Sequence, residues 1–288
     1  MFDESFKNIQ LQQSDISYWY PIFKDFSLTS KFINLESTNF RDWMKEDSII
    51  IPEAFPLSTL IDNELDELGG IVMCKLNWSS PKDAAKLFLD GQKCRSSHDV
   101  LRLIKSSDYI LHDINRRYSK PLCLCLRKWY KIHKSNEFRC FVVNGKLRAM
   151  SQRHIDCYFE ELFSKQEVII DLCEQFYDDN LKGKIMDDQF LVFDVYFNTS
   201  FTKLWLIDIN VFDEYTNPLL YTWDELLGEK EIEELRLVET PENCKGTTDT
   251  FNSYPLELID LVVPIEEKEI TNQLNPYLRD YNKSQYVH

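Results

Sequence analysis

The stretch EFRCFVVNGKLRAMSQR, residues 137–153, decides the expected fold because it has the pattern of a β-hairpin. Two apolar runs flank Asn144 and Gly145, and a type I′ turn needs positive φ at both of its central positions, which these residues tolerate. QFLVFDVYF at 189–197 and TKLWLIDIN at 202–210 predict a second hairpin. The two hairpins together predict an antiparallel sheet.

Helical patterns interleave with these strands, which indicates an α+β protein. LSTLIDNELDELGG at 57–70 predicts a helix that ends at its glycines. SSPKDAAKLFLDG at 79–91 predicts another, with Ser80 as N-cap and Pro81 at the first helical position. Residues 156–181 have apolar positions near helical spacing and predict a third helical segment.

Length and charge bound the organisation and the partners. The chain has 288 residues, which favours two units or one large one. It carries 33 Lys and Arg against 48 Asp and Glu, a net charge of −15. Binding to nucleic acid needs clustered cations, so this balance argues against duplex DNA or an anionic membrane as the main partner. It permits a local basic pocket or a basic protein partner.

Several function classes are excluded by missing motifs. With only 7 glycines, the chain has neither a G-x-G-x-x-G nor a G-x-x-x-x-G-K-[ST] phosphate loop. H-E-x-x-H and G-x-S-x-G are also absent, and the five histidines lack metal-ligand spacing. A nucleotide site, if present, therefore has to be built from scattered side chains.

The compartment is expected to be the cytoplasm. The N-terminal residues have no basic and apolar regions of a signal peptide, and no apolar run approaches the roughly 20 residues of a membrane span. The cysteines form no C-x-x-C, and four of them lie in apolar strand-like runs, which predicts buried thiols in a reducing compartment. These four are Cys74, Cys123, Cys125 and Cys140.

Two acids and an amide stand out in the second hairpin. Because alternate side chains share a face of a strand, Asp208 and Asn210 are expected on one face together with Leu204 and Leu206. A carboxylate and an amide oxygen in this arrangement suit a hard cation such as Mg²⁺. Asp194 is the one charge in its apolar run, so it needs a metal, an Arg or a helix end. The structural alternative is that Asp208 starts a turn and Asp194 pairs with an Arg.

Cations are embedded in strand-like runs in the same way. On the strand that starts at residue 137, Glu137 and Arg139 share a face. Further cations lie within or end other strands: Lys75, Arg127, Lys128 and Arg153. A triphosphate that faces the acids through Mg²⁺ explains both charge sets. Alternatively, the cations are solvated charges at sheet edges or pair with the acids directly.

Beyond these patterns, the sequence resembles the cell division cycle protein 123 family, also called D123. The matching strings follow one another in family order over roughly residues 15–226. They are YWYPIF at 18–23, CKLNWSSPKDA at 74–84, IKSSDYI at 104–110, LRKWY at 126–130, EFRCFVVNGKLRAMSQR at 137–153, FDVY at 193–196, and LIDIN with TNPLLYTWDEL at 206–226.

The resemblance implies an ATP-grasp-like α+β fold with a nucleotide cleft between two closely packed subdomains that contain antiparallel sheets. The ATP-grasp-like domain is expected over 1–230, with subdomains at about 50–130 and 131–230 and the segment 1–49 packed on them. An acidic, partly mobile tail is expected over 231–288.

The resemblance also implies a function. Family members bind ATP with Mg²⁺ and act as assembly chaperones for eukaryotic translation initiation factor two. They contact its gamma subunit, and the outcome is control of initiation and of cell-cycle entry. A chain of this kind is expected to be monomeric alone and to bind neither nucleic acid nor membrane directly.

Site residues carry over where the motifs match. Asp194, Asp208 and Asn210 match the magnesium-side residues, and Lys75 matches a phosphate-contacting lysine. The other matches are nucleotide-side positions: Trp78, Ser80, Lys82, Arg127, Lys128, Tyr130, Glu137, Arg139 and Arg153. One departure is Asn217, which stands where the family usually has an acid.

Three hypotheses follow. The first is a nucleotide-dependent assembly chaperone with little or no turnover. The second is an ATP-grasp ligase or phosphotransferase acting on a protein or a small carboxylate, since such chemistry needs mainly positioning and electrostatics. The third is a scaffold that keeps the fold but has lost ATP, which the intact acids and cations disfavour.

Overall fold

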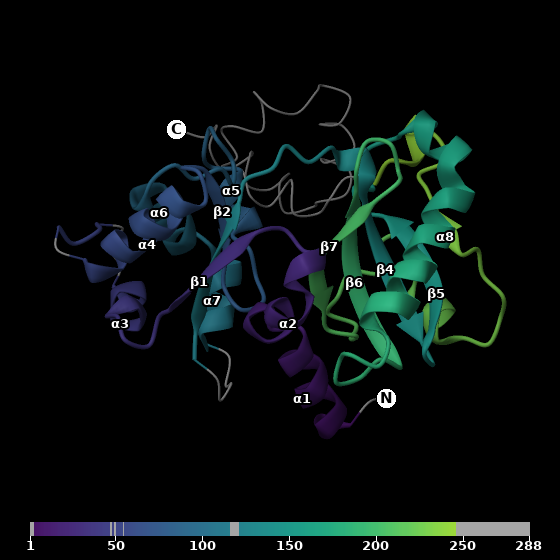
Figure 1. The fold of residues 1–288 in the computed structure, drawn as a ribbon, viewed down its shortest axis with the longest axis horizontal. Coiled ribbons are helices and arrows are strands. Elements are labelled where there is room, and N and C mark those ends of the chain that lie inside the picture. The colour runs from purple at the N-terminus through teal and green to yellow at the C-terminus, as the bar shows by residue number, and fades with distance from the viewer. Residues whose placement is uncertain (1–2, 47, 49, 54, 116–120, 246–288) are drawn as a thin grey trace, which may run out of the picture. The chain divides into compact units, whose positions relative to one another are not determined.

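The computed structural model describes residues 3–46, 48, 50–53, 55–115 and 121–245. They lie in one compact unit, Met1–Gly246. Its framework is two β-sheets, one of three strands and one of five, each covered by helices (Figure 1). The predicted α+β architecture is therefore present.

The small sheet has the strand order β1-β3-β2 and is antiparallel throughout. Its strands are β1 (Ser30–Asn34), β3 (Cys123–Lys128) and β2 (Val72–Lys75). Helices α4 (Pro56–Glu67) and α6 (Ser97–Lys105) pack against it through one apolar cluster. The N-terminal segment thus supplies a strand of this sheet rather than only covering it.

The large sheet has the order β7-β6-β4-β5-β8. Its strands are β7 (Leu204–Asn210), β6 (Phe190–Phe197), β4 (Glu137–Val143), β5 (Lys146–Gln152) and β8 (Leu235–Arg236). Both predicted hairpins are present, β4–β5 and β6–β7. The turn residues Asn144 and Gly145 have φ of 53° and 69°, as a type I′ turn requires. The β5–β8 pair is parallel, which the prediction of antiparallel sheets did not include.

One face of the large sheet packs into the main hydrophobic core. Helices α2 (Ile16–Phe23) and α8 (Gln166–Phe176) cover it, and Trp19 is fully buried there. Strand side chains in this core include Phe138, Cys140, Phe193, Val195, Leu206 and Ile209. The opposite face has a second apolar cluster at one end, around Phe141, Val192 and Phe212. Its remaining part carries the charged residues.

The prediction that Leu204 and Leu206 share a face of their strand with Asp208 is wrong. The ladder between β6 and β7 shifts by one residue between Asp194 and Val195, so Asp194 pairs with Asp208 whereas Val195 pairs with Leu206. Such a bulge breaks the period of two. Leu204 and Leu206 therefore join the main core, while Asp208 lies on the opposite face.

The remaining helices are mostly short. They are α1 (Glu4–Gln13), α3 (Phe40–Lys45), α5 (Lys82–Ala85), α7 (Asp108–Asn115) and α9 (Trp223–Leu227), with 3₁₀ turns at Lys24–Phe26, Lys134–Asn136, Glu160–Lys165 and Pro241–Asn243 and a π turn at Tyr177–Leu181. The helix predicted over 79–91 is only one turn, and Ser80 is not its N-cap. The segment 156–181 is α-helical only in α8.

The described chain continues past residue 230. Strand β8 extends the large sheet, and Leu235, Leu237 and Val238 are buried. The prediction placed the start of the tail at 231, before this strand. A strand of two residues has too little periodicity to be recognised in a sequence. The rest of the predicted tail, 246–288, lies outside the described residues. Among those described, no helix has the length and apolar character to cross a membrane.

Candidate functional site

A row of polar residues crosses four strands of the large sheet. The register pairs Ser151 with Arg139, Arg139 with Asp194, and Asp194 with Asp208. Residues directly opposite each other in a sheet point to the same face. Four separate strands therefore bring these side chains together, on the face that α8 does not cover.

Asp194 is the centre of this row and is buried. Arg139 donates its Nε–H to Oδ1 of Asp194 at 2.7 Å and its Nη2–H to Oδ2 at 2.8 Å. Asn210 donates Nδ2–H to Oδ2 at 3.2 Å, and Nε of Arg153 lies 3.7 Å from the same oxygen. Burial alone would raise the pKa of Asp194, but Arg139, Arg153 and Lys82 outweigh it and hold that pKa well below its usual value. The carboxyl is therefore ionised.

Lys75 and Arg127 connect the small sheet to this row. Lys75 donates from Nζ to both carboxylate oxygens of Asp208, at 2.8 and 2.7 Å, and its side chain is 3% exposed. Arg127 donates Nη1–H to the carbonyl of Ile207 at 2.8 Å and Nε–H to Ser30 at 3.3 Å. Its Nη2 is buried without a hydrogen-bond partner. The junction between the sheets thus holds a buried guanidinium with unused donor capacity.

Lys82 faces the same cluster from α5. Its pKa is lowered to about 8, first by the nearby charge of Arg153 and then by desolvation, while Asp194, Asp208 and Glu137 oppose the shift. Desolvation and Arg139 likewise lower the pKa of Arg153. Desolvation and the crowding of cations around few acids thus contribute to both shifts.

The charge balance of this cluster is positive. Its cations are Lys75, Lys82, Arg127, Arg139 and Arg153, and its carboxylates are Glu137, Asp194 and Asp208. Five cations against three carboxylates give a net charge of +2 in a chain of net charge −15. Partly buried charges need compensation, so the cluster suits an anion.

The three predicted metal ligands lie together. Asp194 and Asp208 are cross-strand partners, and Asn210 donates its amide N–H to Asp194, which leaves its Oδ1 for a cation. Within the described ranges, no three His, Cys, Asp or Glu side chains gather into a metal site. A divalent ion here would need Asn210 and oxygens of a bound anion besides the two acids, as Mg²⁺ commonly does with nucleotide phosphates.

The contacts described for four predicted site residues do not place their side chains in the cluster. Trp78 donates its indole N–H to the carbonyl of Leu11 at 2.9 Å. Ser80 accepts the backbone N–H of Lys82 through its carbonyl. The remaining two belong to the chain that leaves the small sheet, where Lys128 is exposed and Tyr130 contacts Thr29 through its hydroxyl at 3.3 Å.

Two neighbours on the same face were missed. Tyr196 pairs with both Glu137 and Trp205 across the ladders, and the two aromatic rings stack at 6.2 Å. His154 lies 3.2 Å from Glu137 through Nε2. The bulge hides Trp205 from a period-two prediction. Tyr196 is the last residue of the matching string FDVY, and this match could have indicated it.

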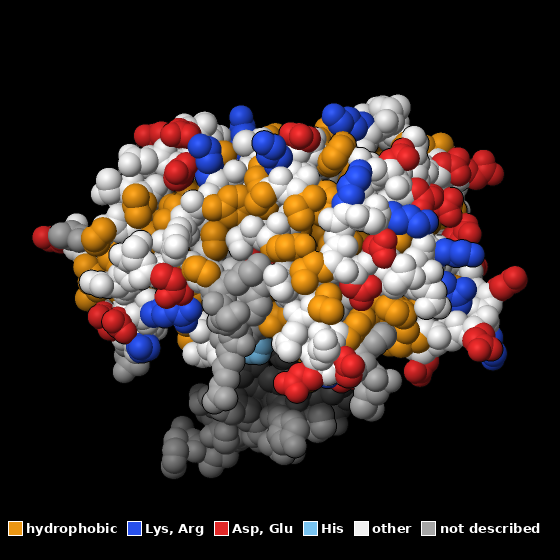
Figure 2. Space-filling model, turned by 60° about the horizontal axis from the view of Figure 1, so that its bottom comes forward, with side chains coloured by type: hydrophobic (Ala, Val, Ile, Leu, Met, Phe, Trp, Pro, Cys, Tyr) orange, Lys and Arg blue, Asp and Glu red, His pale blue; other side chains and the backbone are white. Residues whose placement is uncertain are grey.

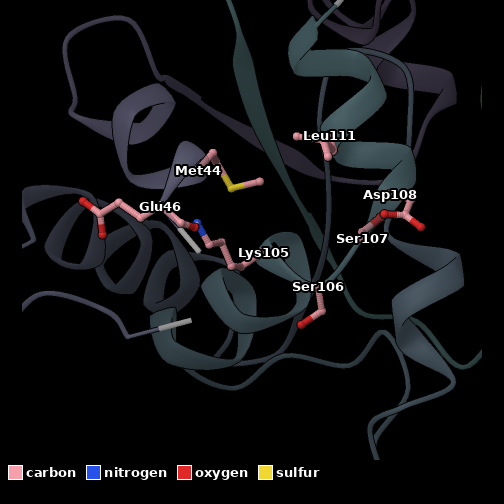
Figure 3. A pocket seen from close by; sticks show the side chains of 7 residues that line it. All are labelled: Met44, Glu46, Lys105, Ser106, Ser107, Asp108 and Leu111. Atoms are coloured by element: carbon pink, nitrogen blue, oxygen red, sulfur yellow. The ribbon is translucent and has the colours of Figure 1, made fainter. Parts of the chain in front are cut away.

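One pocket in the described part of the chain lies apart from the charge cluster. It is about 250 Å³ in volume and lies between the end of α3 and the α6–α7 turn, and it contains none of the predicted site residues (Figure 3). Lys105 donates there to the carbonyl oxygens of Trp43 and Glu46, which closes the end of α3. Ser107 donates to Asp83 at 2.6 Å. These contacts explain the pocket residues structurally.

On the face of the molecule drawn in Figure 2, acidic and basic side chains are interspersed. On the face shown there, hydrophobic side chains gather towards the middle. The positive balance of the cluster between the sheets is therefore a local feature, as the sequence allowed.

Comparison with known proteins assigns this α+β chain with a charged junction between two sheets to a family. A family model described as D123 matches residues 54–262. A Xenopus laevis protein named translation initiation factor eIF2 assembly protein is 31% identical over 271 residues, with 76% of this chain and 78% of the relative covered. A Dictyostelium discoideum protein of the same name is 36% identical over 229 residues, with 76% and 59% covered.

A solved structure agrees. Cdc123 from Schizosaccharomyces pombe aligns with a TM-score of 0.72 and 34% identity, over 81% of this chain and 98% of that one. The chain belongs to the D123 family, that of cell division cycle protein 123. The resemblance seen in the sequence motifs and the predicted fold class are both confirmed.

Proposed function

We propose that the protein binds ATP with Mg²⁺ at the junction of the two sheets and, in this form, promotes assembly of eukaryotic translation initiation factor two through its gamma subunit. The observation that carries the first half is the charge cluster, whose net +2 matches the −2 of a magnesium–ATP complex. The unused Nη2–H donors of Arg127 support an anionic ligand further.

The residues divide by chemistry. Asp194, Asp208 and the amide oxygen of Asn210 would hold the metal, which would neutralise phosphate charge when bound. Lys75, Lys82, Arg127, Arg139 and Arg153 would contact the phosphates, with the fork of an Arg suited to two phosphate oxygens at once. The contacts of Trp78, Ser80, Lys128 and Tyr130 give no such support, so their nucleotide roles rest on the motif match.

Binding would act on the relation between the sheets. Lys75 and Arg127 come from the small sheet, whereas Asp194, Asp208 and Arg139 come from the large one. An anion held by both groups would fix the two sheets in one orientation. A fixed orientation can present a single surface to a protein partner, which is what an assembly factor needs and which requires no turnover.

The assembly role is supported by the relatives named eIF2 assembly protein, since this chain shares most of its length with the Xenopus one. The acidic surface is compatible with a partner that has basic patches. The gamma subunit as the direct contact, the monomeric state and the cytoplasmic location follow from the family resemblance and belong to the same proposal.

Calorimetric titration of ATP, with and without Mg²⁺, tests the cleft. We expect Mg²⁺-dependent binding by the full chain, loss of the Mg²⁺ dependence in Asp208→Asn, and unchanged binding in the surface control Asp42→Asn, whose side chain is 83% exposed. Equal affinity of both variants would refute the metal assignment. A second titration with the isolated gamma subunit tests the partner. ADP release that requires an added carboxylate or protein acceptor would instead establish the ligase or phosphotransferase alternative.

A further inference from the structure

A groove of about 920 Å³ runs along the outer edge of the large sheet, away from the charge cluster. It lies between the region of α8 and the segment that follows α9. About half of its lining is apolar, with Ile170 and Phe163 from the α8 region and Leu220, Leu235 and Leu237 from the segment after α9. Phe163 is 38% exposed, so part of its ring is open to solvent.

The groove follows the backbone of β8. This strand is the last in the sheet order, and its one strand neighbour among the described residues is β5. The carbonyl of Glu234 accepts from Met150 N–H, and Val238 N–H donates to Gln152, so these groups face β5. Because successive residues of a strand point their backbone groups to opposite sides, those of Leu235 and Leu237 point away from β5.

The rim of the groove is acidic. Glu233, Glu234 and Glu239 line it from the β8 segment. On α8 and the turn after it, Glu167, Asp171, Glu174 and Asp178 are exposed and spaced by four, three and four residues, which places them on one face. The pKa of Glu174 is raised, first by burial and then by the charges of Glu234, Asp171 and Asp178. Glu174 of α8 and Glu234 of the β8 segment therefore lie close enough to repel each other.

The cations of the groove relieve this repulsion only in part. Arg236 divides its guanidinium between groups, because its Nη2 donates to Glu225 at 2.7 Å, its Nη1 donates to the carbonyl of Leu220 at 3.0 Å, and its Nε lies 3.7 Å from Glu233. Lys245 is the other cation in the lining. Three acids thus line the groove, Glu174 lies close to one of them, and among the described residues no further strand pairs with β8. A cationic occupant would lower the mutual repulsion of these acids.

We propose that this groove binds an extended segment of a partner protein in which Lys or Arg alternates with aliphatic residues. The segment would add as a strand to Leu235–Leu237. Its aliphatic side chains would fill the channel over Phe163 and Ile170, and its cations would meet Glu233, Glu234 and Glu239. Strand addition supplies affinity through backbone hydrogen bonds, and the alternating side chains supply specificity. This site is independent of the nucleotide cleft.

The test uses the full chain and a fluorescein-labelled octapeptide that alternates Lys and Val, with anisotropy as the readout. Two matched probes separate the contributions. One replaces every Lys by Glu, and the other keeps the sequence but carries N-methyl groups on the backbone nitrogens of alternate residues. We expect the Lys–Val peptide to bind at least tenfold more tightly than either, since one loses the charge match and the other the ladder.

Charge-reversal variants locate the binding. The double variant Glu233→Lys/Glu239→Lys should weaken the Lys–Val peptide at least tenfold. Glu4→Lys/Asp25→Lys changes the net charge equally at exposed positions outside the groove and should bind like the original chain. Equal weakening by both variants would show that only the overall negative charge attracts the peptide, which overturns the proposal.

Hydrogen exchange decides between occupants. The amides of Leu235 and Leu237 should exchange rapidly in the free chain and become protected when the peptide binds. Protection in the free chain would mean that another part of this chain, or a second copy if sedimentation shows a dimer, already covers the edge. The proposal is overturned if the edge is already covered in either of these ways. It is also overturned if the N-methylated peptide binds as tightly as the Lys–Val peptide, or if the Lys–Val peptide does not bind.

Discussion

Replacement of Asp194 by Asn tests whether the buried ion pair at the centre of the site stabilises the fold. Asp194 is 8% exposed and receives two hydrogen bonds from Arg139. In Asp194→Asn, Arg139 keeps the carbonyl of Asn217 but loses its counter-ion in a place where its side chain is 5% exposed. Removal of one partner of a buried pair costs about 3–5 kcal/mol. Because Asn keeps one acceptor oxygen, we expect about 3 kcal/mol.

Urea unfolding without nucleotide measures this loss. With a slope of about 3 kcal/mol per molar urea, the expected loss lowers the midpoint by about 1 M. Asp42→Asn removes an acid from an exposed pair with Lys45 and should change the free energy of unfolding by less than about 0.5 kcal/mol. If the two variants unfold at the same midpoint, Arg139 is adequately solvated without Asp194 and the argument from burial fails.

The pH dependence adds a second readout. The pKa of Asp194 in the folded protein is below its unfolded value, so its stabilising contribution is present above about pH 4 and disappears as the pH falls towards the folded pKa. The stability difference between the original chain and Asp194→Asn should therefore shrink on acidification below about pH 4. A constant difference would contradict the assignment.

Three further outcomes are expected. A double-mutant cycle with Lys75→Met and Asp208→Asn, measured by urea unfolding, should give a coupling energy of about 1.5–3 kcal/mol. The reason is that the hydrogen bond between Lys75 and Asp208 is charge-assisted and Lys75 is buried. A coupling energy near zero would contradict this. ATP affinity should be constant below about pH 8 and fall above it, because Lys82 then loses its proton. The variant Lys82→Arg should bind ATP without this decline. Calorimetric titrations at several pH values measure both. Gly145→Ala should lower the free energy of unfolding by about 1–2 kcal/mol because of the positive φ at this position. An added cost is expected because the new Cβ would lie 3.0 Å from the side chain of Gln189. Gly91→Ala also has a positive φ but open space around it, so it should lose less stability in thermal or urea unfolding.

Local signals made much of the fold predictable. The Asn144–Gly145 turn specifies one hairpin by itself because few residues adopt two successive positive φ angles. Thr222 and Glu225 form a capping box at α9, a motif that spans four residues and needs no distant partner. Helix α6 begins after Ser96, whose side chain accepts the backbone N–H of Asp99, so this cap too lies within a few residues of sequence.

Features set by distant contacts were not predictable. The helix predicted over 79–91 ends after Ala85, and its residue Asp83 accepts hydrogen bonds from Ser107 and Asp108 in a distant part of the chain. Strand β8 exists because Leu235 pairs with Met150 from a hairpin far back in the chain. No window of sequence contains both partners.

The candidate site illustrates both situations. That Asp194 and Arg139 needed opposite charges was clear from their apolar surroundings, and the structure shows that they satisfy each other. The alternative in which Asp194 pairs with an Arg is therefore confirmed, whereas a metal beside it stays a proposal. The partner of Lys75 was open because residue separation gives no hint of a contact with Asp208 between two sheets.

The bulge in β7 has a consequence for insertions and deletions. Ile207 is the extra residue between Leu206 and Asp208, and its carbonyl, left out of the ladder, accepts the hydrogen bond from Arg127. Deletion of Ile207 would still allow Leu206 to pair with Val195 and Asp208 with Asp194. The strand would remain regular, but Arg127 would lose one of the acceptors that link the small sheet to the large one. Lys75 would keep its bonds to Asp208, so shortening the strand to its ideal form would weaken the junction of the sheets without separating them.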